Sequence, residues 1–256
     1  MRFISWNVNG LRATHKNGDL NWIFDQNPDA ICLQEVKATT DQLPPEIASP
    51  AGYHAFFDWP KLKKGYSGVA IYSKEKPEKV LYGMGVEKYD NEGRMLTAIY
   101  KEYVLINIYF PNGGGPAERL EYKLGFYDEF LKFVETLRKK HKNIIFCGDV
   151  NVAHTEIDIA RPKENESHVG FLPVERAWMD KVIEKGYIDT FRHMHKDEKD
   201  AYSYWDQKSF ARDRNIGWRI DYFFVNKEII SKVKKSFMWR DIYGSDHCPI
   251  ELDIAI

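Results

Sequence analysis

Acidic and amide side chains follow apolar segments at several places in this sequence. The segments RFISWN, ICLQE, INIYFPN and IIFCGDVN are rich in β-branched and aromatic residues, which is typical of strands, and each ends in polar residues. Taken singly, an Asn or Asp after a strand is more often a turn former than a catalytic group. Taken together, these side chains could meet at one mouth of a sheet structure. They are Asn7, Glu35, Tyr109, Asn112, Asp149 and Asn151.

A carboxylate and an imidazole form a second candidate group. Asp221 interrupts the apolar segment GWRIDYF, where an unpaired charge would be costly, so it requires a partner. His247, in GSDHCP just before the strand-like IELDIAI, is the candidate. A carboxylate bound to one imidazole nitrogen leaves the other nitrogen free to act as a base or donor. The alternative is a pair that only ties two strands together.

The candidate residues together indicate a metal ion that acts on a phosphate ester. No serine or cysteine stands in a nucleophile-elbow pattern. Glu35, Asp149 and Asp246, with the amides near them, offer oxygen ligands, which favour Mg²⁺ or Mn²⁺ over zinc. Such a cation neutralises phosphate oxygens and a leaving alkoxide, while a carboxylate or imidazole prepares the attacking water.

The elements that position these groups are predicted to be many strands and few long helices. Residues 95–100 and 103–110 are separated only by Lys101 and Glu102, which predicts an antiparallel hairpin and therefore mixed sheets. We expect an α/β fold with two such sheets face to face and helices outside, a four-layer α/β/β/α sandwich, as one domain over residues 1–256. The other predicted strands are 3–7, 30–35, 68–73, 143–149, 219–225 and 250–256, and helices are predicted from Pro116 to the segment RKKH, from Pro173 to Gly186, and from an Asp19 cap to Pro28.

Composition narrows the class of protein. The formal net charge of −1 excludes a protein that coats nucleic acid with its whole surface, so any grip on phosphates must be local. The three cysteines show no CxxC spacing and indicate neither a disulfide framework nor a zinc site. No apolar run approaches the ~20 residues of a membrane span, and we expect a cytoplasmic protein with no membrane contact. Residues 152–171 lack periodicity and read as either a functional or a plain surface loop.

Eight segments, taken in order, resemble the exonuclease III family of abasic-site endonucleases, which has the DNase I-like fold. The resemblance spans residues 2 to 250. The SDH motif alone would be weak, because other phosphodiesterases of this fold share it. The segments are ISWNVNGLRA, PDAICLQEVK, NIYFPNG, CGDVNVAH, IDIARPKEN, GFLPVERAW, NIGWRIDYFFVN and GSDHCPI.

The resemblance implies Mg²⁺-dependent hydrolysis, with Mn²⁺ as a substitute, of the phosphodiester 5′ to an abasic site in duplex DNA. The product would carry a 3′-hydroxyl, and 3′ to 5′ exonuclease and 3′-end cleaning would accompany the incision. By motif, Glu35 is the principal metal ligand, with Asn7 and Asn9 nearby and Asp246 on the metal side. Some relatives carry Asp where this chain has Asn9.

The resemblance also implies roles around the phosphate. Asp149 activates or orients the attacking water, with Asn151 beside it. His247, oriented by Asp221, stabilises developing charge, and Tyr109 and Asn112 also reach the phosphate. Either Asp149 or His247 can be the general base, and we favour Asp149.

Substrate contacts follow from the same resemblance. An apolar slot for the abasic sugar would consist of Tyr204, Trp218 and Ile220, for which ordinary aromatic core is the alternative. Some relatives have an arginine where the loop here reads NGGGPAE, so this loop inserts no side chain into DNA. Backbone contacts would come from Lys61, Lys63, Lys64, Lys123, Arg212 and Arg214, whereas residues 232–235 read as a solvated face.

Two other functions compete with this interpretation. One is a phosphodiesterase of the same fold that acts on another phosphate ester. The other is a catalytically inactive DNA-binding module, which the presence of Glu35, Asp149, Asn151, Asp221 and His247 disfavours. A monomer is the default expectation.

Overall fold

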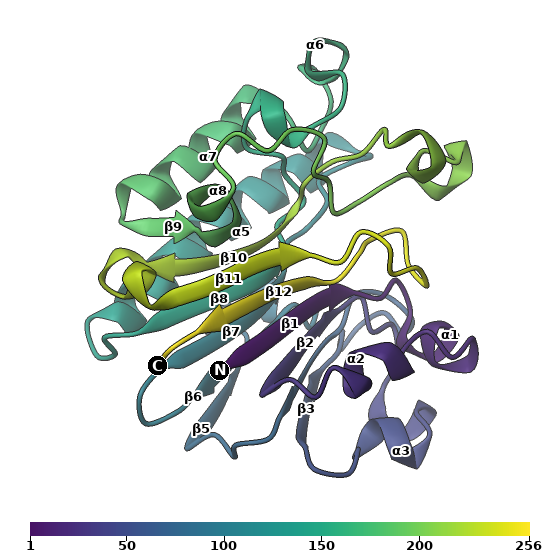
Figure 1. Ribbon diagram of the computed structural model, residues 1–256, viewed down its shortest axis with the longest axis vertical. Helices are drawn as coiled ribbons and strands as arrows, with labels where there is room; N and C mark the ends of the chain where they lie inside the picture. The colour runs from purple at the N-terminus through teal and green to yellow at the C-terminus, as the bar shows by residue number, and fades with distance from the viewer.

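Two six-stranded mixed sheets face each other in the computed structural model, which describes residues 1–256 (Figure 1). Neighbouring strands are antiparallel except for β1 with β2 and β7 with β8, which are parallel. The first sheet has the order β11 (Val233–Met238), β12 (Ile250–Ile254), β1 (Arg2–Asn7), β2 (Ala30–Gln34), β4 (Val69–Ser73), β3 (His54–Asp58). The second has the order β5 (Lys79–Tyr82), β6 (Met95–Ile99), β7 (Val104–Tyr109), β8 (Ile144–Asp149), β10 (Asp221–Asn226), β9 (Tyr187–Asp189).

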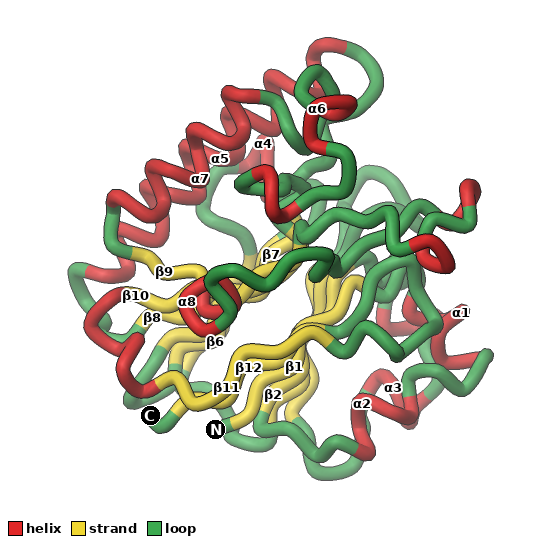
Figure 2. The backbone as a smooth tube through the Cα atoms, turned by 45° about the horizontal axis from the view of Figure 1, so that its top comes forward, coloured by secondary structure: helices red, strands yellow, loops and turns green.

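Helices lie on the outer faces of both sheets (Figure 2). The α1 (Leu11–Lys16), α2 (Asn21–Asp25) and α3 (Pro45–Ala48) helices pack on the first sheet, and the long helices α5 (Ala117–Arg138) and α7 (Pro173–Glu184) pack on the second. Short α-helices are α4 (Glu87–Asp90), α6 (Pro162–Asn165) and α8 (Thr190–Met194), and 3₁₀ turns occur at Thr40–Gln42, Glu156–Asp158, Gln207–Ser209, Arg212–Arg214 and Lys227–Lys232.

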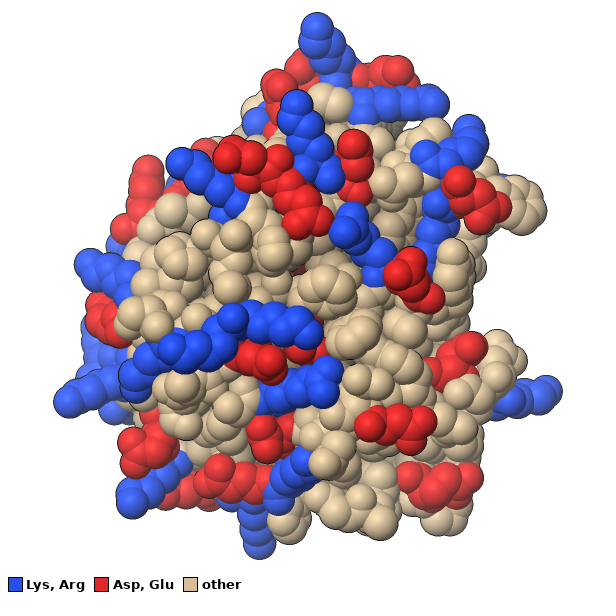
Figure 3. Space-filling view, viewed as in Figure 1, with Lys and Arg blue, Asp and Glu red and all other residues tan.

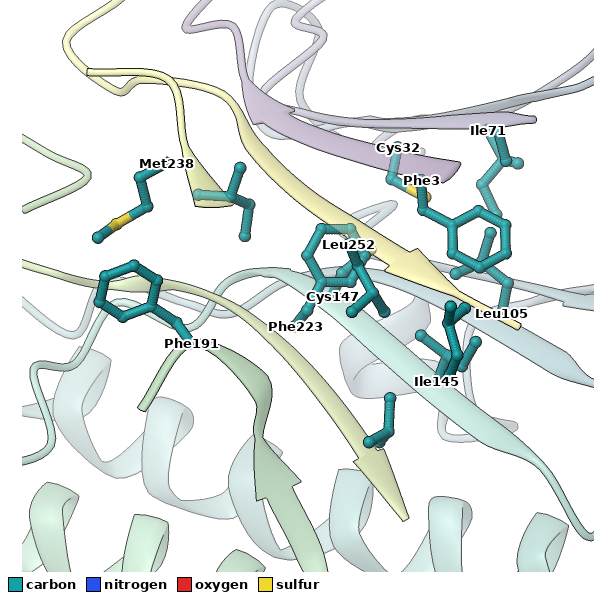
Figure 4. Packing of buried hydrophobic residues seen from close by; sticks show 14 of the residues in the cluster. Phe3, Cys32, Ile71, Leu105, Ile145, Cys147, Phe191, Phe223, Met238 and Leu252 are labelled. Carbon is teal, nitrogen blue, oxygen red and sulfur yellow. The ribbon is translucent and has the colours of Figure 1, made fainter. Parts of the chain in front are cut away.

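The central strands are buried on both faces, which explains their nearly continuous apolar sequences. In β1, Phe3 points between the sheets, whereas Ile4 and Trp6 point to the helices of the first sheet. Cys32 of β2 and Leu105 of β7 meet Phe3 in the core between the sheets (Figure 4). Because both sheets share this core, the expected four-layer sandwich is confirmed. One domain over residues 1–256 stays a prediction.

The predicted elements match the structure closely in the centre of the chain and less well at its edges. All eight predicted strands are present, as are the hairpin between β6 and β7 and the helices α5 and α7. The third predicted helix is shorter than expected, because Asp19 does not cap it and Leu20 occupies the cap position. The edge strands β3, β5, β9 and β11 were not predicted.

Two segments for which no element was predicted contain regular structure. Residues 232–235, expected to be a solvated face, lie mainly in the edge strand β11, where Lys234 is exposed. Charged side chains on an edge strand keep it from pairing with other chains. Residues 152–171 contain two short helical turns, and Ala153, Ile159 and Phe171 pack in a small buried cluster with Ile220. None of the helices combines the length and apolar character that crossing a membrane requires.

Candidate active site

The polar side chains predicted from strand ends lie around one cavity of about 390 Å³. The parallel pairs β1–β2 and β7–β8 both deliver their carboxyl ends to this mouth: Asn7 pairs with Gln34, and Tyr109 pairs with Asp149. The antiparallel β10 begins there, with Asp221 opposite Asp149. The cavity is lined by Glu35, Tyr109, Asn112, Asp149, Asn151, Val169, Gly170, Tyr204, Asp206, Trp218, Ile220, Asp246 and His247.

Unusual backbone conformations occur around this mouth. Glu35 and Asn151 have φ values of 51° and 56°, in the left-handed region that side chains other than glycine rarely adopt. Gly148, just before Asp149, has φ 134°, and a Cβ there would lie 1.9 Å from the carbonyl oxygen of Ile108. The glycine of the CGD segment is therefore required for the backbone to bring Asp149 into the cavity.

The predicted partnership of Asp221 and His247 is confirmed. Nδ1 of His247 lies 2.8 Å from Oδ2 of Asp221, and both side chains are buried. The hydroxyl of Ser203 donates to the same oxygen at 2.7 Å and accepts the backbone N–H groups of Ile220 and Asp221. This arrangement leaves Nε2 of His247 facing Oδ2 of Asp149 at 3.9 Å.

Asn7 bridges the two sheets at the base of the mouth. Its amide nitrogen donates to Oε1 of Glu35 and to Oδ2 of Asp149, both at 2.9 Å. Asp149 also accepts from the backbone N–H of Asn151 at 2.8 Å and from the Asn151 side chain at 3.2 Å. The carboxylates of Glu35 and Asp149 are thus held on the two sides of one amide.

The Glu35 side of the mouth contains Asn9, Asp246 and Lys37. Asn9 donates to Oδ1 of Asp246 at 3.0 Å and accepts a hydrogen bond from the Lys37 ammonium. Lys37 also pairs with Oε2 of Glu35 at 2.7 Å. Asn9 therefore connects the two acids of this side by way of a cation.

These residues fit a hard divalent cation. Oxygens of Glu35 and Asp149 and a ring nitrogen of His247 lie within 4.8 Å of one another. Carboxylates outnumber cations here, since Asp221 and Asp246 lie in the same neighbourhood. Carboxylate and amide oxygens are the ligands that Mg²⁺ and Mn²⁺ prefer. Because Asp221 already engages His247, the group with free oxygens that could hold such a cation is Glu35, with Asn7 and Asp246 near it.

Electrostatics set the Asp149–His247 pair apart from Glu35. Burial raises the pKa of Asp149 to about 8, and the charges of Asp221 and Glu35 add to the effect against the lowering influence of His247. Burial lowers the pKa of His247, but the charge and hydrogen bond of Asp221, with the charges of Asp149 and Asp246, together outweigh burial and raise the pKa to about 10. Burial likewise opposes ionisation of Glu35, yet Lys37 and Asn7 hold its pKa below the usual value.

Tyr109 and Asn112 lie on the second-sheet side of the cavity. Burial, with the Glu35 charge, raises the pKa of the Tyr109 phenol well above its usual value, so it remains a neutral donor. The guanidinium of Arg94 lies 4.7 Å from the centre of the Tyr109 ring and donates to its carbonyl oxygen at 3.2 Å. Asn112 donates to Oδ1 of Asn151 at 3.1 Å, which joins the two amides in one chain.

An apolar slot adjoins the polar side chains. Tyr204, Trp218 and Ile220 all line the cavity and pack with a small buried cluster beside it. The Tyr204 ring lies 4.9 Å from the His247 ring, and a Cβ at Gly170 would lie 3.0 Å from the Trp218 ring. The predicted slot residues therefore come together next to the Asp–His pair, with Tyr204 and Trp218 partly exposed and Ile220 buried.

The basic residues expected to contact DNA separate into three groups. Lys61, Lys63 and Lys64 are exposed on one loop, and Arg214 is exposed at the end of the 3₁₀ turn Arg212–Arg214. The Arg212 guanidinium is stacked between Trp205 and Tyr243, at 4.6 and 4.1 Å from their rings, and donates to three backbone carbonyls, so it anchors a loop.

Lys123 requires a correction. We expected a contact with the DNA backbone, but its side chain is fully buried, and its ammonium is occupied by Glu175 and two backbone carbonyls. Lys123 lies on the face of α5 that packs on the second sheet. No charge pattern in the sequence indicated that this lysine would be buried.

Four residues of the site were not identified from the sequence. Lys37 ends the segment PDAICLQEVK, two residues after Glu35, and that spacing was the available signal. Arg94 precedes β6 directly, where a buried charge was detectable in the same way as Asp221. Ser203 and Ser245, the latter of which donates to the carbonyl of Asn7 at 2.7 Å, carry no signal, because serine is common in loops.

A mouth of carboxylates, amides and one imidazole held by a carboxylate, with no activated serine or cysteine, defines a metal-assisted phosphodiesterase. The model of the Endonuclease/Exonuclease/phosphatase family matches residues 4–247. An exodeoxyribonuclease of Bacillus subtilis (strain 168) is 42% identical over 257 residues that cover all of both chains. The DNA repair nuclease APEX1 of Danio rerio is 39% identical, over all of this chain and 83% of that protein.

Solved structures agree with the sequence relatives. An AP endonuclease from Archaeoglobus fulgidus superposes with a TM-score of 0.88 at 29% identity, and a 3′-5′ exonuclease from Neisseria meningitidis with a TM-score of 0.89 at 26% identity. Each match covers all of both chains. The chain belongs to the Endonuclease/Exonuclease/phosphatase family and, within it, to the exonuclease III group of nucleases. Members of this family depend on divalent metal ions.

Proposed function

We propose that this chain is a DNA repair nuclease that hydrolyses the phosphodiester 5′ to an abasic site in duplex DNA and leaves a 3′-hydroxyl. The observation that carries the proposal is the position of the apolar slot directly beside the Asp221–His247 pair and Asp149. A sugar without a base offers shape rather than hydrogen bonds, so a slot of this kind suits it. The names of the relatives, which include an exodeoxyribonuclease, support 3′ to 5′ exonuclease and 3′-end cleaning at the same site.

The metal proposed is Mg²⁺, with Mn²⁺ as a substitute, held by Glu35 with Asn7, Asp246 and Asn9 on the same side. When bound, it would neutralise phosphate oxygens and the departing 3′-oxygen, which is the ordinary chemistry of a hard cation at a phosphate ester. Lys37 balances part of the Glu35 charge from the outer side. We expect Lys37 to keep Glu35 ionised in the absence of metal as well.

Asp149 is the proposed base. It accepts two hydrogen bonds from Asn151 and one from Asn7, which orient its carboxylate toward the cavity. Added positive charge beside Glu35 would lower the pKa of Asp149 from its value of about 8, so that the carboxylate can take a proton from the attacking water near neutral pH.

His247 is proposed to act as a cation rather than as the base. With Asp221 on Nδ1 and a pKa of about 10, the ring stays protonated and directs Nε2–H toward the phosphate. Tyr109 and Asn112 add neutral donors from the other side of the cavity. Asp149 therefore takes the proton of the attacking water, and His247 balances the charge on the phosphate.

DNA is proposed to be held by local basic groups and not by a general positive surface. Lysines and arginines are interspersed with acids on the face shown in Figure 3, apart from one short basic band. The exposed Lys61, Lys63 and Lys64 and the exposed Arg214 lie on loops rather than in the core, and we propose that they contact phosphates. We further propose that the protein acts as a monomer in the cytoplasm.

The test uses a duplex oligonucleotide with a single tetrahydrofuran abasic analogue, incubated with Mg²⁺ or EDTA. We expect Mg²⁺-dependent nicking 5′ to the analogue by the wild type, and its loss in His247→Ala. His54→Ala, an exposed histidine on edge strand β3, is the matched control and should nick normally. Binding without nicking in any divalent metal would instead identify an inactive DNA-binding module, and nicking confined to another phosphate ester would identify a different phosphodiesterase.

A further inference from the structure

A buried ion pair joins the two long helices behind the candidate active site. Lys123 of α5 and Glu175 of α7 are both 0% exposed, and the ammonium contacts Oε1 of the carboxylate. Burial of such a pair is not in itself evidence for stability, because the cost of removing two charges from water can equal their attraction. The hydrogen bonds that the pair makes to other groups therefore indicate its role.

Each member of the pair holds backbone groups of loops that border the cavity. The Lys123 ammonium donates to the carbonyl oxygen of Asn151 at 2.7 Å and to that of Asn112 at 3.3 Å. Oε2 of Glu175 accepts the backbone N–H groups of Gly170 at 2.6 Å and Leu172 at 3.1 Å. The loops after β7 and β8 and the loop before α7 thus converge on one pair of charges.

These loops carry the two halves of the site. The first two contain the Asn112–Asn151 amide chain, which ends on Asp149. The third contains Gly170, whose Cα packs against Trp218 so closely that a Cβ would approach the ring to 3.0 Å. A shift of one loop relative to another would therefore move the amides of the phosphate side with respect to the sugar slot.

We propose that the Lys123–Glu175 pair is a positioning device for catalysis, which sets the distance between the Asn112–Asn151 amides and the Gly170 wall of the slot. The assignment rests on the proposed function of the cavity. It makes Lys123 and Glu175 positioning residues and not catalytic ones, since neither reaches the cavity surface.

The helices themselves have other means of holding together. The Tyr127 and Trp178 rings stack at 4.1 Å between α5 and α7, and Nε1 of Trp178 donates to the carbonyl of Tyr127 at 3.1 Å. An apolar replacement of the whole ion pair should therefore leave the helices packed. Only the donors and acceptors for the three loops would be lost.

The test compares Lys123→Met/Glu175→Leu with the wild type. The double substitution avoids an unpaired buried charge, which either single substitution would create and which alone could unfold the protein. We expect cooperative thermal unfolding to be retained and kcat on the abasic duplex to fall about 100-fold, with KM within about threefold, because misplaced groups weaken the transition state more than binding. Arg138→Gln/Glu228→Gln, which removes an exposed ion pair at the far end of α5, is the matched control and should keep full activity.

A second measurement is independent of activity. Hydrogen exchange of the metal-free, DNA-free protein should accelerate in residues 110–115, 150–153 and 168–173 of the double variant, while β8 and β10 keep their protection. Retained kcat in a folded double variant, a loss of kcat that only follows the folded fraction, or uniform acceleration of exchange would each overturn the proposal. A wild type without nicking activity would instead remove the proposed function, and the exchange pattern would still report on whether the pair holds the loops.

Discussion

Two buried charge clusters lie close to the start of strand β10, which Asp221 begins and Arg219 shortly precedes, and they are built on opposite principles. The mouth cluster consists of Glu35, Asp149, Asp221 and His247, in which three carboxylates face one imidazole. The Asp158 cluster consists of Asp158, Asp189, Arg192 and Arg219, in which two carboxylates face two guanidinium groups. The first is unbalanced in charge and the second is balanced.

The balance decides how each cluster ionises. In the Asp158 cluster, burial alone would raise the pKa of Asp158, but the charges and hydrogen bonds of Arg219 and Arg192 hold it well below its usual range. In the mouth cluster, burial and like charges raise the pKa of Asp149 to about 8. A buried acid with its full set of partners stabilises the fold, whereas one without them is available for proton transfer.

The strongest test of this contrast is Asp149→Asn. We expect kcat for nicking of the abasic duplex to fall about a thousandfold or more, because the amide cannot take a proton from water. Stability of the metal-free protein should be unchanged or higher, because a crowded carboxylate is removed. Single-turnover nicking assays and urea unfolding measure the two effects. Retention of a tenth of the wild-type rate would make His247 the better candidate for the base.

The reverse pattern is expected for Asp158→Asn. The free energy of unfolding should fall by about 3–5 kcal/mol, because Arg192 and Arg219 keep their buried charges without this partner. Urea denaturation measures the loss. The folded fraction of this variant should nick the abasic duplex at close to the wild-type rate, since Asp158 does not line the cavity. A large fall in kcat without a fall in stability would contradict the division between the clusters.

Asp221→Asn tests the charge on His247. The charge of Asp221 raises the pKa of His247, so its removal should lower that pKa and leave less imidazolium at a given pH. If imidazolium is the active form, activity falls as pH rises through this pKa, and the alkaline limb of the kcat profile should move to lower pH. We expect about a 10- to 100-fold loss near neutral pH. An unmoved alkaline limb would remove His247 from the electrostatic role.

A further effect is expected on the stability of the metal-free protein as a function of pH. His247 has a folded pKa of about 10, above the ~6.5 of an unfolded chain, so its stabilisation is complete below pH ~6.5 and is lost as pH rises through 10. The raised pKa of Asp149 acts in the same direction, with stability lost as pH rises from about 4 to 8. Metal-free protein should therefore melt at a lower temperature at pH 9 than at pH 6.

Added Mg²⁺ should offset part of that loss. At ten times its Kd, it is expected to add about 1.4 kcal/mol of stability. Differential scanning calorimetry of wild type and Glu35→Gln measures the effect, and the variant should not respond to Mg²⁺. The Asp158 cluster contributes nothing to the change, because its depressed pKa confines the loss of its stabilisation to acid below about pH 4. An equal Mg²⁺ effect in Glu35→Gln would place the metal elsewhere.

Much of the fold was predictable because the central strands have strong local signals. Asp221 was identified as needing a partner, and His247 as that partner, from one rule on buried charge. The four edge strands were missed because they are short or partly exposed, so their alternation is weak. Lys123 was misplaced because a lysine on a helix is usually solvated, and only the contacts of Glu175 explain its burial.

The sequence by itself determined the layers of the sandwich and the polar residues that end its parallel strands, because strand and helix periodicities and turn residues are local properties of the chain. The tertiary structure alone decided which of those polar groups are balanced by cations. The contact of Ser203 with Asp221 and the Lys123–Glu175 pair join residues that are far apart in the sequence, and no spacing indicates them. Charge balance is a sum over neighbours in space, and the chain acquires those neighbours only when the two sheets close on each other.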